Sequence, residues 1–232
     1  MPGSLGGILC RTRYIDDVLQ RSLAGGLDQV VILGAGFDTR AYRISGMDRV
    51  RVFEVDLPGA CEAKQSRLES VLGSVPQHVA LVGMDFDRQD LGKMLSASGF
   101  QTGQRTLFIW EGVTQYITAE AVSHTLEFVS RVSGAGSSIV FTYVRRGIID
   151  GTDRPEWMGS FLAFAGKVGS PMIFGLDRAE LEPYLSERDL ELVEDVGVAD
   201  YQELYLRPLG RKLDVFDGER CAFARVPPPL VG

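Results

Sequence analysis

Long hydrophobic runs are missing from this 232-residue chain. A membrane-spanning helix needs roughly 18 to 20 consecutive apolar residues, and the most apolar stretches here, residues 30–33 and 107–110, are far shorter. The first ten residues have no basic start and too short an apolar core for a secretory signal. The sequence therefore predicts neither a membrane span nor membrane partners, and we expect a cytoplasmic protein.

Positive charge and cysteine are also scarce. The 24 Lys and Arg residues face 31 Asp and Glu residues, and the resulting formal charge of −7 disfavours a nucleic-acid partner. The 3 cysteines have no Cys-x-x-Cys spacing, which argues against a disulfide framework and a zinc site. We expect free thiols and no bound metal.

Short apolar runs bounded by turn residues alternate with stretches of helical period, a pattern typical of a parallel sheet covered by helices. Strands are predicted at residues 29–33, 50–55, 79–82, 106–110, 138–143, 191–196 and 221–226. Helices are predicted at residues 62–72, after Thr118, and after Asp177, which we expect to act as a cap. Successive βα units predict an α/β fold with a doubly wound sheet. We expect one domain over residues 1–232.

Residues 145–175 interrupt this alternation, because their aromatic residues and glycines follow no single period. We predict that they form an insertion over the carboxyl edge of the sheet, on the substrate side.

The predicted strands end in residues suited to a nucleoside ligand, and ligands of open parallel sheets bind beyond the carboxyl ends of the strands. Gly34-Ala35-Gly36 follows the first strand, where it allows a ligand to approach the backbone closely. Asp56 lies 20 positions after Gly36, the spacing at which a carboxylate meets a ribose hydroxyl. Asp85 and Glu111 end the third and fourth strands. Taken alone, each acid is equally compatible with a helix cap or a solvated loop.

The glycine turn lacks the third glycine of the dinucleotide fingerprint and has Asp38 and Thr39 there instead. Asp38 would repel a phosphate but attract an amine or a sulfonium. An NAD-dependent oxidoreductase is therefore the weaker alternative for this site.

Six segments carry a family resemblance: Arg11-Thr12-Arg13-Tyr14, Gly34-Ala35-Gly36-Phe37-Asp38-Thr39-Arg40, Val55-Asp56-Leu57-Pro58, Asp85-Phe86, Trp110-Glu111-Gly112-Val113-Thr114-Gln115-Tyr116 and Gly218-Glu219-Arg220. They span nearly the whole chain and resemble the leucine carboxyl methyltransferase family of bacterial S-adenosylmethionine-dependent O-methyltransferases. The resemblance implies a Rossmann-like class I methyltransferase sheet, mostly parallel with an antiparallel last strand. It also implies S-adenosyl-L-methionine as the cofactor.

The resemblance assigns cofactor contacts position by position. The residues expected to bind the cofactor are Arg11, Gly34, Ala35, Gly36, Asp38, Asp56, Leu57, Asp85, Phe86 and Glu111. By this resemblance Arg11 binds the methionine carboxylate and Asp56 the ribose hydroxyls. Asp85 and Phe86 frame the adenine, and the family usually has leucine where Phe86 stands.

Acceptor contacts are expected next to the methyl donor. By the resemblance Glu111 approaches the donor and Tyr116 lines the acceptor pocket, so both are candidate catalytic residues that act mainly by positioning. Tyr143, Arg145 and Arg146 lie at and beyond the fifth strand. They are candidates to bind an anionic acceptor, although the two arginines are also compatible with solvated loop charges.

The only histidines, His78 and His124, are predicted to lie outside the reactive edge. A pocket without histidine suits a small-molecule acceptor with a carboxylate or an acidic hydroxyl, such as a specialised metabolite.

Only ten residues precede Arg11, where the family usually carries several dozen more. We therefore expect a more open pocket, or closure by residues 145–175 or by the partner subunit of a homodimer. A non-catalytic cofactor-binding relative is the alternative function.

Overall fold

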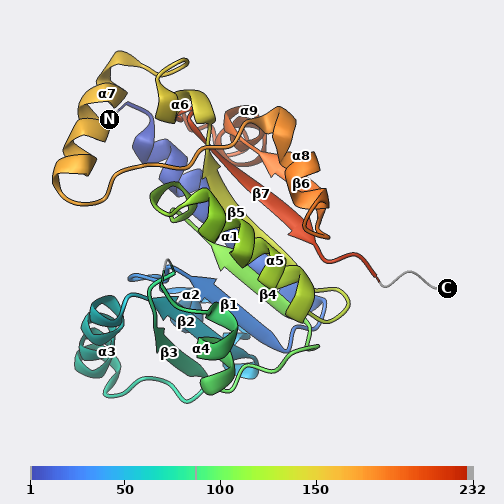
Figure 1. The fold of residues 1–232 in the computed structure, drawn as a ribbon. Helices are drawn as coiled ribbons and strands as arrows, with labels where there is room; N and C mark the ends of the chain where they lie inside the picture. Colours follow the sequence, from blue (N-terminus) through green and yellow to red (C-terminus); the bar gives the residue numbers. More distant parts are fainter. Residues whose placement is uncertain (1, 87, 229–232) are drawn as a thin grey trace.

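A seven-stranded sheet forms the centre of the protein (Figure 1). The computed structural model describes residues 2–86 and 88–228. Its strands are β1 (Gln29–Leu33), β2 (Arg51–Asp56), β3 (Val79–Gly83), β4 (Thr106–Trp110), β5 (Ser138–Val144), β6 (Glu191–Val196) and β7 (Glu219–Arg225). They are ordered β3-β2-β1-β4-β5-β7-β6. The strands β1 to β5 pair in parallel, whereas β7 is antiparallel to both of its neighbours, β5 and β6. The predicted α/β sheet with an antiparallel last strand is confirmed.

Helices cover both faces of this sheet. Side chains alternate along each strand, so Val31 and Leu33 of β1 join one apolar cluster, and Val30 and Ile32 join another on the opposite face. The first cluster contains residues of α4 (Leu91–Ala97), α5 (Ala119–Val132) and α8 (Arg178–Ser186). The second contains residues of α1 (Ser4–Ala24), α2 (Arg40–Arg43), η1 (Met47–Arg49), α9 (Val198–Tyr201) and η3 (Gln202–Leu206). Because both faces are covered, β1 and β4 are buried along their whole length.

Local sequence explains several helix boundaries. Pro58 stands at the first position of α3 (Pro58–Leu72), where a missing N–H has no cost. Thr118 caps α5, because its Oγ1 accepts a hydrogen bond from the Ala121 backbone N–H at 3.1 Å. The helix predicted after Asp177 is present as α8, but the Asp177 side chain makes no capping hydrogen bond.

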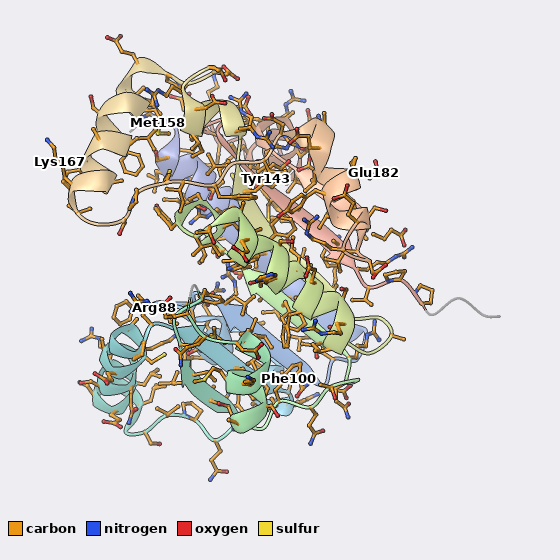
Figure 2. All side chains as sticks on the ribbon, viewed as in Figure 1. Arg88, Phe100, Tyr143, Met158, Lys167 and Glu182 are labelled. Carbon is orange, nitrogen blue, oxygen red and sulfur yellow. The ribbon has the colours of Figure 1, made fainter. Side chains whose placement is uncertain are left out.

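The segment of residues 145–175 follows the carboxyl end of β5. It contains α6 (Arg146–Asp150), α7 (Glu156–Lys167) and an irregular return. Figure 1 shows α6 and α7 beyond the end of β5, near the start of α1. Met158 of α7, labelled in Figure 2, packs with Val144 and Ile148. The return is tied to η2 (Thr114–Tyr116), since the Ile173 N–H donates to the Gln115 carbonyl at 2.8 Å.

Within the described residues, every helix is too short or too polar to cross a membrane. Cys10, Cys61 and Cys221 are free thiols.

Candidate functional site

The glycine turn after β1 lines a cavity at the carboxyl edge of the sheet, where the strand order reverses between β1 and β4. This glycine-turn cavity is lined by Arg11, Thr12, Ile32, Leu33, Gly34, Ala35, Gly36, Phe37, Asp38, Thr39, Arg40, Arg43 and Glu111. Gly34 has a φ of 66°, and a Cβ there would lie 2.2 Å from Cγ2 of Val113. Only glycine therefore fits this backbone. The turn leaves the cavity lined by backbone on one side.

Asp56 lies directly against this turn. Its Oδ2 accepts a hydrogen bond from the Gly36 N–H at 2.6 Å, and its Oδ1 accepts one from the Leu57 N–H at 2.7 Å. The spacing of 20 positions thus does bring the carboxylate to the glycine turn. Both backbone donors hold Asp56 in place next to the glycine-turn cavity.

Glu111, at the end of β4, is held between two arginines. Its Oε1 accepts from Arg11 Nε at 2.9 Å, and its Oε2 accepts from Arg40 Nη1 at 2.7 Å. Burial raises the pKa of the Glu111 carboxyl, but the charges and hydrogen bonds of Arg40 and Arg11 outweigh burial, so the pKa lies below its ordinary value. Glu111 is therefore ionised at neutral pH and poorly suited to act as a proton acceptor.

Arg40 is the centre of this network, a role that was not predicted from the sequence. Its side chain is 3% exposed and also pairs with Asp16, at 2.7 Å, and with Asp38, at 2.5 Å. The sequence feature that could have identified Arg40 is its position at the end of the Gly-Ala-Gly-Phe-Asp-Thr-Arg segment, which carries the family resemblance. Because the cation is paired with carboxylates from α1, the turn and β4, it fixes these elements together.

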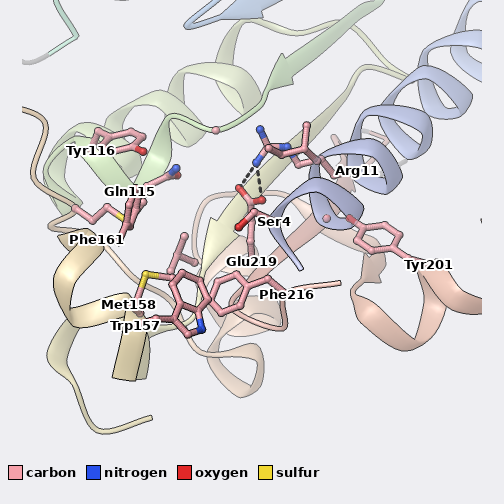
Figure 3. Close-up of a pocket in the computed structure, with 15 residues that line it drawn as sticks. Ser4, Arg11, Gln115, Tyr116, Trp157, Met158, Phe161, Tyr201, Phe216 and Glu219 are labelled. Atoms are coloured by element: carbon pink, nitrogen blue, oxygen red, sulfur yellow. Dashed lines mark hydrogen bonds and ion pairs between the residues drawn. The ribbon is translucent and has the colours of Figure 1, made fainter. Parts of the chain in front are cut away.

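A second cavity opens on the other side of Arg11 (Figure 3). This aromatic cavity is lined by Ser4, Gly7, Ile8, Arg11, Gly112, Gln115, Tyr116, Val144, Trp157, Met158, Phe161, Met172, Tyr201, Phe216 and Glu219. The rings of Trp157 and Phe216 meet edge to face, with centroids 5.1 Å apart. Tyr116 lies on the wall of this cavity, and its contact with an acceptor stays a prediction.

Arg11 belongs to the walls of both cavities. Its Nη1 donates to Glu219 Oε1 at 2.7 Å, while its Nε donates to Glu111. Glu219 belongs to the Gly-Glu-Arg segment of the family resemblance, but no role was predicted for it because it lies 208 positions from Arg11. The antiparallel pairing of β7 brings it to the site.

Asp85 and Phe86 do not line the glycine-turn cavity. Phe86 lines a separate cavity between α4 and α5, together with His124. Asp85 Oδ2 lies 3.5 Å from Arg88 Nε at the surface. Neither residue is among those that line the glycine-turn cavity, and their contact with adenine stays a prediction. His78 Nε2 lies 3.1 Å from the Ala41 carbonyl and is also outside both cavities.

Three residues expected to bind the acceptor make other contacts in the structure, and their role in acceptor binding stays a prediction. Tyr143 is fully buried in the sheet (Figure 2), where its hydroxyl donates to Asp195 at 3.0 Å. Arg145 donates to the Asp217 carbonyl at 2.7 Å and pairs with Asp153, and Arg146 pairs with Glu180. None of the three is among the residues lining the aromatic cavity. Side chains alternate along β5, and Tyr143 lies on the face of the sheet that packs against α4, α5 and α8.

The architecture is that of class I methyltransferases. The crystal structure of a magnesium protoporphyrin IX methyltransferase from Synechocystis, solved with bound SAH, has a TM-score of 0.56 with this chain. The match covers 94% of this chain and 84% of the other at 11% identity, so it concerns the fold alone.

The chain belongs to the leucine carboxyl methyltransferase family, whose model matches residues 1–130. A relative from Frankia alni is 38% identical over 143 residues, which are 62% of this chain and 50% of the relative. A relative from Mycolicibacterium gilvum is 32% identical over 194 residues, which are 78% of this chain and 61% of the relative. Both are named "Putative S-adenosyl-L-methionine-dependent methyltransferase". The chain thus spans between half and two thirds of the length of these relatives.

Proposed function

We propose that this chain is an S-adenosyl-L-methionine-dependent O-methyltransferase acting on a small molecule that offers a hydroxyl or a carboxylate. The observation that carries the proposal is that Arg11 is shared by the glycine-turn cavity and the aromatic cavity. A methyltransferase needs a polar site for the nucleoside cofactor directly beside a site for the acceptor. The family membership and the names of the relatives support the same activity.

The residues of the glycine-turn cavity fit this cofactor. Gly36 has a φ of 41°, and a Cβ there would meet only Asp56 Oδ2, at 4.0 Å, so the turn keeps open space at this position. The Asp56 carboxylate lies against the turn, as a ribose would require. Arg11 offers a cation for the methionine carboxylate. Asp38 and Glu111 offer negative charge toward an amine or a sulfonium. When bound, the cofactor supplies an activated methyl group.

The other task of the protein's residues is to position the acceptor and to exclude water from it. Methyl transfer from a sulfonium is an in-line displacement, so an acceptor oxygen must be aligned and desolvated. The apolar walls of the aromatic cavity exclude water, and Tyr116 contacts the acceptor. Glu111 stays ionised and orients Arg11 rather than accepting a proton.

The dinucleotide alternative fits less well. A pyrophosphate usually binds at the N-terminus of a helix that follows the glycine turn, but α2 here has 4 residues. Asp38 and Thr39 stand where the dinucleotide fingerprint has its third glycine, so the turn brings a carboxylate rather than a bare backbone to this cavity.

Calorimetric titration with S-adenosylmethionine, S-adenosylhomocysteine and NAD tests the proposal. We expect micromolar binding of the first two and none of NAD. Asp56→Ala should abolish measurable binding, because the variant loses the proposed ribose contact. Wild-type affinity in this variant, or binding of NAD alone, would contradict the proposed site. Cofactor binding without transfer to any hydroxyl or carboxylate compound in a broad panel would favour the non-catalytic alternative.

A further inference from the structure

We infer that the methyl acceptor is an uncharged aromatic compound whose ring hydroxyl donates a hydrogen bond to Oε1 of Gln115 in the aromatic cavity. For the methyl-transfer step this inference rests on the proposed function. For binding it rests on the aromatic cavity alone.

Gln115 presents an unused hydrogen-bond acceptor. The residue is 4% exposed, lines the aromatic cavity, and its Oε1 has no hydrogen-bond partner in the structure. Buried polar atoms nearly always have a partner, so an orphaned oxygen on a residue that lines a cavity indicates a ligand that donates a hydrogen bond. Because Oε1 is itself covered in the structure, the amide turns toward the cavity to accept this bond. Figure 3 places Gln115 beside Tyr116 and Phe161, to the left of Glu219.

The backbone holds Gln115 in a fixed position. Its carbonyl accepts from the Ile173 N–H at 2.8 Å and from the Phe174 N–H at 3.3 Å. Next to it, Thr114 Oγ1 donates to the Thr142 carbonyl at 2.7 Å. A ligand without a donor leaves this buried oxygen unpaired, so the cavity discriminates against such ligands.

The other walls fit a flat ring. The side chains of Trp157, Phe161 and Phe216 come from α7 and from the segment before β7, and Met158 and Met172 fill the space around them. Aromatic rings and thioethers both pack favourably against an aromatic ligand. A hydroxylated ring would therefore be bound by its faces and oriented by its hydroxyl.

The charges of the aromatic cavity disfavour a carboxylate. Among its described lining residues, Arg11 and Glu219 are the charged ones. Arg11 is shared between the carboxylates of Glu219 and Glu111, so these three side chains carry a net negative charge. If Arg11 instead pairs with a cofactor carboxylate, less positive charge remains to balance the negative charge of Glu219. A carboxylate acceptor would enter without a free cation, whereas a neutral hydroxyl needs only an acceptor atom such as Gln115 Oε1.

The transfer step balances without a further reactant. The hydroxyl oxygen forms a bond to the methyl carbon, and the bond from that carbon to sulfur breaks with its electron pair going to sulfur. The hydroxyl proton leaves to solvent, and the products are an aryl methyl ether and S-adenosylhomocysteine. Gln115 aligns the oxygen and takes no proton.

Three ligands of one shape test the inference: 2-naphthol, 2-methoxynaphthalene and 2-naphthoate. Equilibrium dialysis against the protein measures binding without any methyl transfer. We expect wild type to bind 2-naphthol at least about tenfold more tightly than the methyl ether, from one good hydrogen bond, and to bind 2-naphthoate least. Gln115→Leu should reduce the hydroxyl preference to less than threefold and leave the methyl ether affinity unchanged. Gln115→Glu, which keeps an oxygen there, should retain the preference.

Gln65→Leu is the matched control, because Gln65 is exposed on α3 and bonds to Glu69. It should behave as wild type in every titration. Tighter binding of 2-naphthoate than of 2-naphthol by wild type would overturn the inference whether or not the variants fold. An undiminished hydroxyl preference in a folded Gln115→Leu protein would do the same.

The cofactor titration separates this inference from the proposed function. Binding of S-adenosylmethionine together with transfer to 2-naphthoate but not 2-naphthol overturns the inference and keeps the function. A hydroxyl preference that depends on Gln115, in a protein that binds no S-adenosylmethionine, supports the binding part of the inference and overturns the function.

Discussion

Arg11 Nε lies 2.9 Å from Glu111 Oε1, although the two residues are 100 positions apart in the chain. The same guanidinium reaches Glu219 through Nη1, so a single side chain of α1 joins the ends of β4 and β7. A ligand carboxylate that binds Arg11 must therefore compete with two carboxylates of the protein. Ligand affinity at this point depends on how strongly Glu111 and Glu219 are held elsewhere.

The lowered pKa of Glu111 predicts a pH-dependent stability difference. Because the folded-state pKa lies below the ordinary value of 4.5, ionised Glu111 stabilises the fold above that value. This stabilisation is lost as the pH falls through 4.5 toward the folded-state pKa. Glu111→Gln should lower the free energy of unfolding by about 2 kcal/mol at pH 7. Urea titrations at several pH values should show a constant gap to wild type above about pH 5.5 and a narrower gap below 4.5. A gap that widens on acidification would contradict the assignment.

Arg40 should contribute far more to stability than its neighbour Arg43. Arg40→Met leaves Asp16, Asp38 and Glu111 without their buried cation, and we expect a loss of roughly 3–5 kcal/mol in urea unfolding. The Arg43 side chain is 40% exposed and pairs with the Asp16 carboxylate. Arg43→Ala should cost at most about 1 kcal/mol. Equal losses in the two variants would show that Arg40 does not hold the network together.

Gly34 should tolerate no side chain. Gly34→Ala places a Cβ 2.2 Å from Val113 at a φ of 66°, so steric overlap and backbone strain add up to more than about 2 kcal/mol. Gly73 provides the control, because it has a φ of 83° but no heavy atom within 4 Å of the position that a Cβ would take. Gly73→Ala should cost only about 1 kcal/mol. Thermal unfolding measures the stability of both variants. Similar losses of stability would show that overlap with Val113 does not contribute.

Arg146 should not affect acceptor binding. Its side chain pairs with Glu180 outside the aromatic cavity, so Arg146→Ala should leave the acceptor KM within about twofold of wild type. Trp157→Ala removes a ring from the cavity wall and should raise the KM at least about tenfold, as expected for losing a large buried aromatic contact. Steady-state kinetics with any acceptor from the panel compares the two. A larger effect of Arg146→Ala would restore the anionic acceptor suggested by the sequence.

Most of the fold was predictable because the strands have strong local signals. The runs at Gln29–Leu33 and Thr106–Trp110 are apolar throughout most of their length, bounded by turn residues, and appear as β1 and β4 with those limits. The glycine turn and Asp56 were found by spacing, since both lie at the end of adjacent parallel strands. These features depend on residues close in sequence or on a regular topology.

The aromatic cavity was less predictable because its residues come from distant, irregular segments. Gln115 stands next to Tyr116, but its role depends on burial by residues 172–174, which no local pattern indicates. Arg145 and Arg146 follow a strand end, as site residues often do, yet they pair with Asp153 and Glu180. The choice of ion-pair partner is a tertiary property, so the sequence pattern could not decide it.

The position of β7 between β5 and β6 has a consequence for how the protein assembles. β6 pairs with β7 and depends on a strand made after it, while Glu219 reaches Arg11 only when β7 is inserted. During synthesis the five parallel strands can pair first, but the aromatic cavity lacks one wall until β7 emerges from the ribosome. Contacts of such long sequence separation form slowly. Completion of the aromatic cavity therefore depends on β7, and a nascent chain that lacks β7 also lacks the Glu219 wall of this cavity.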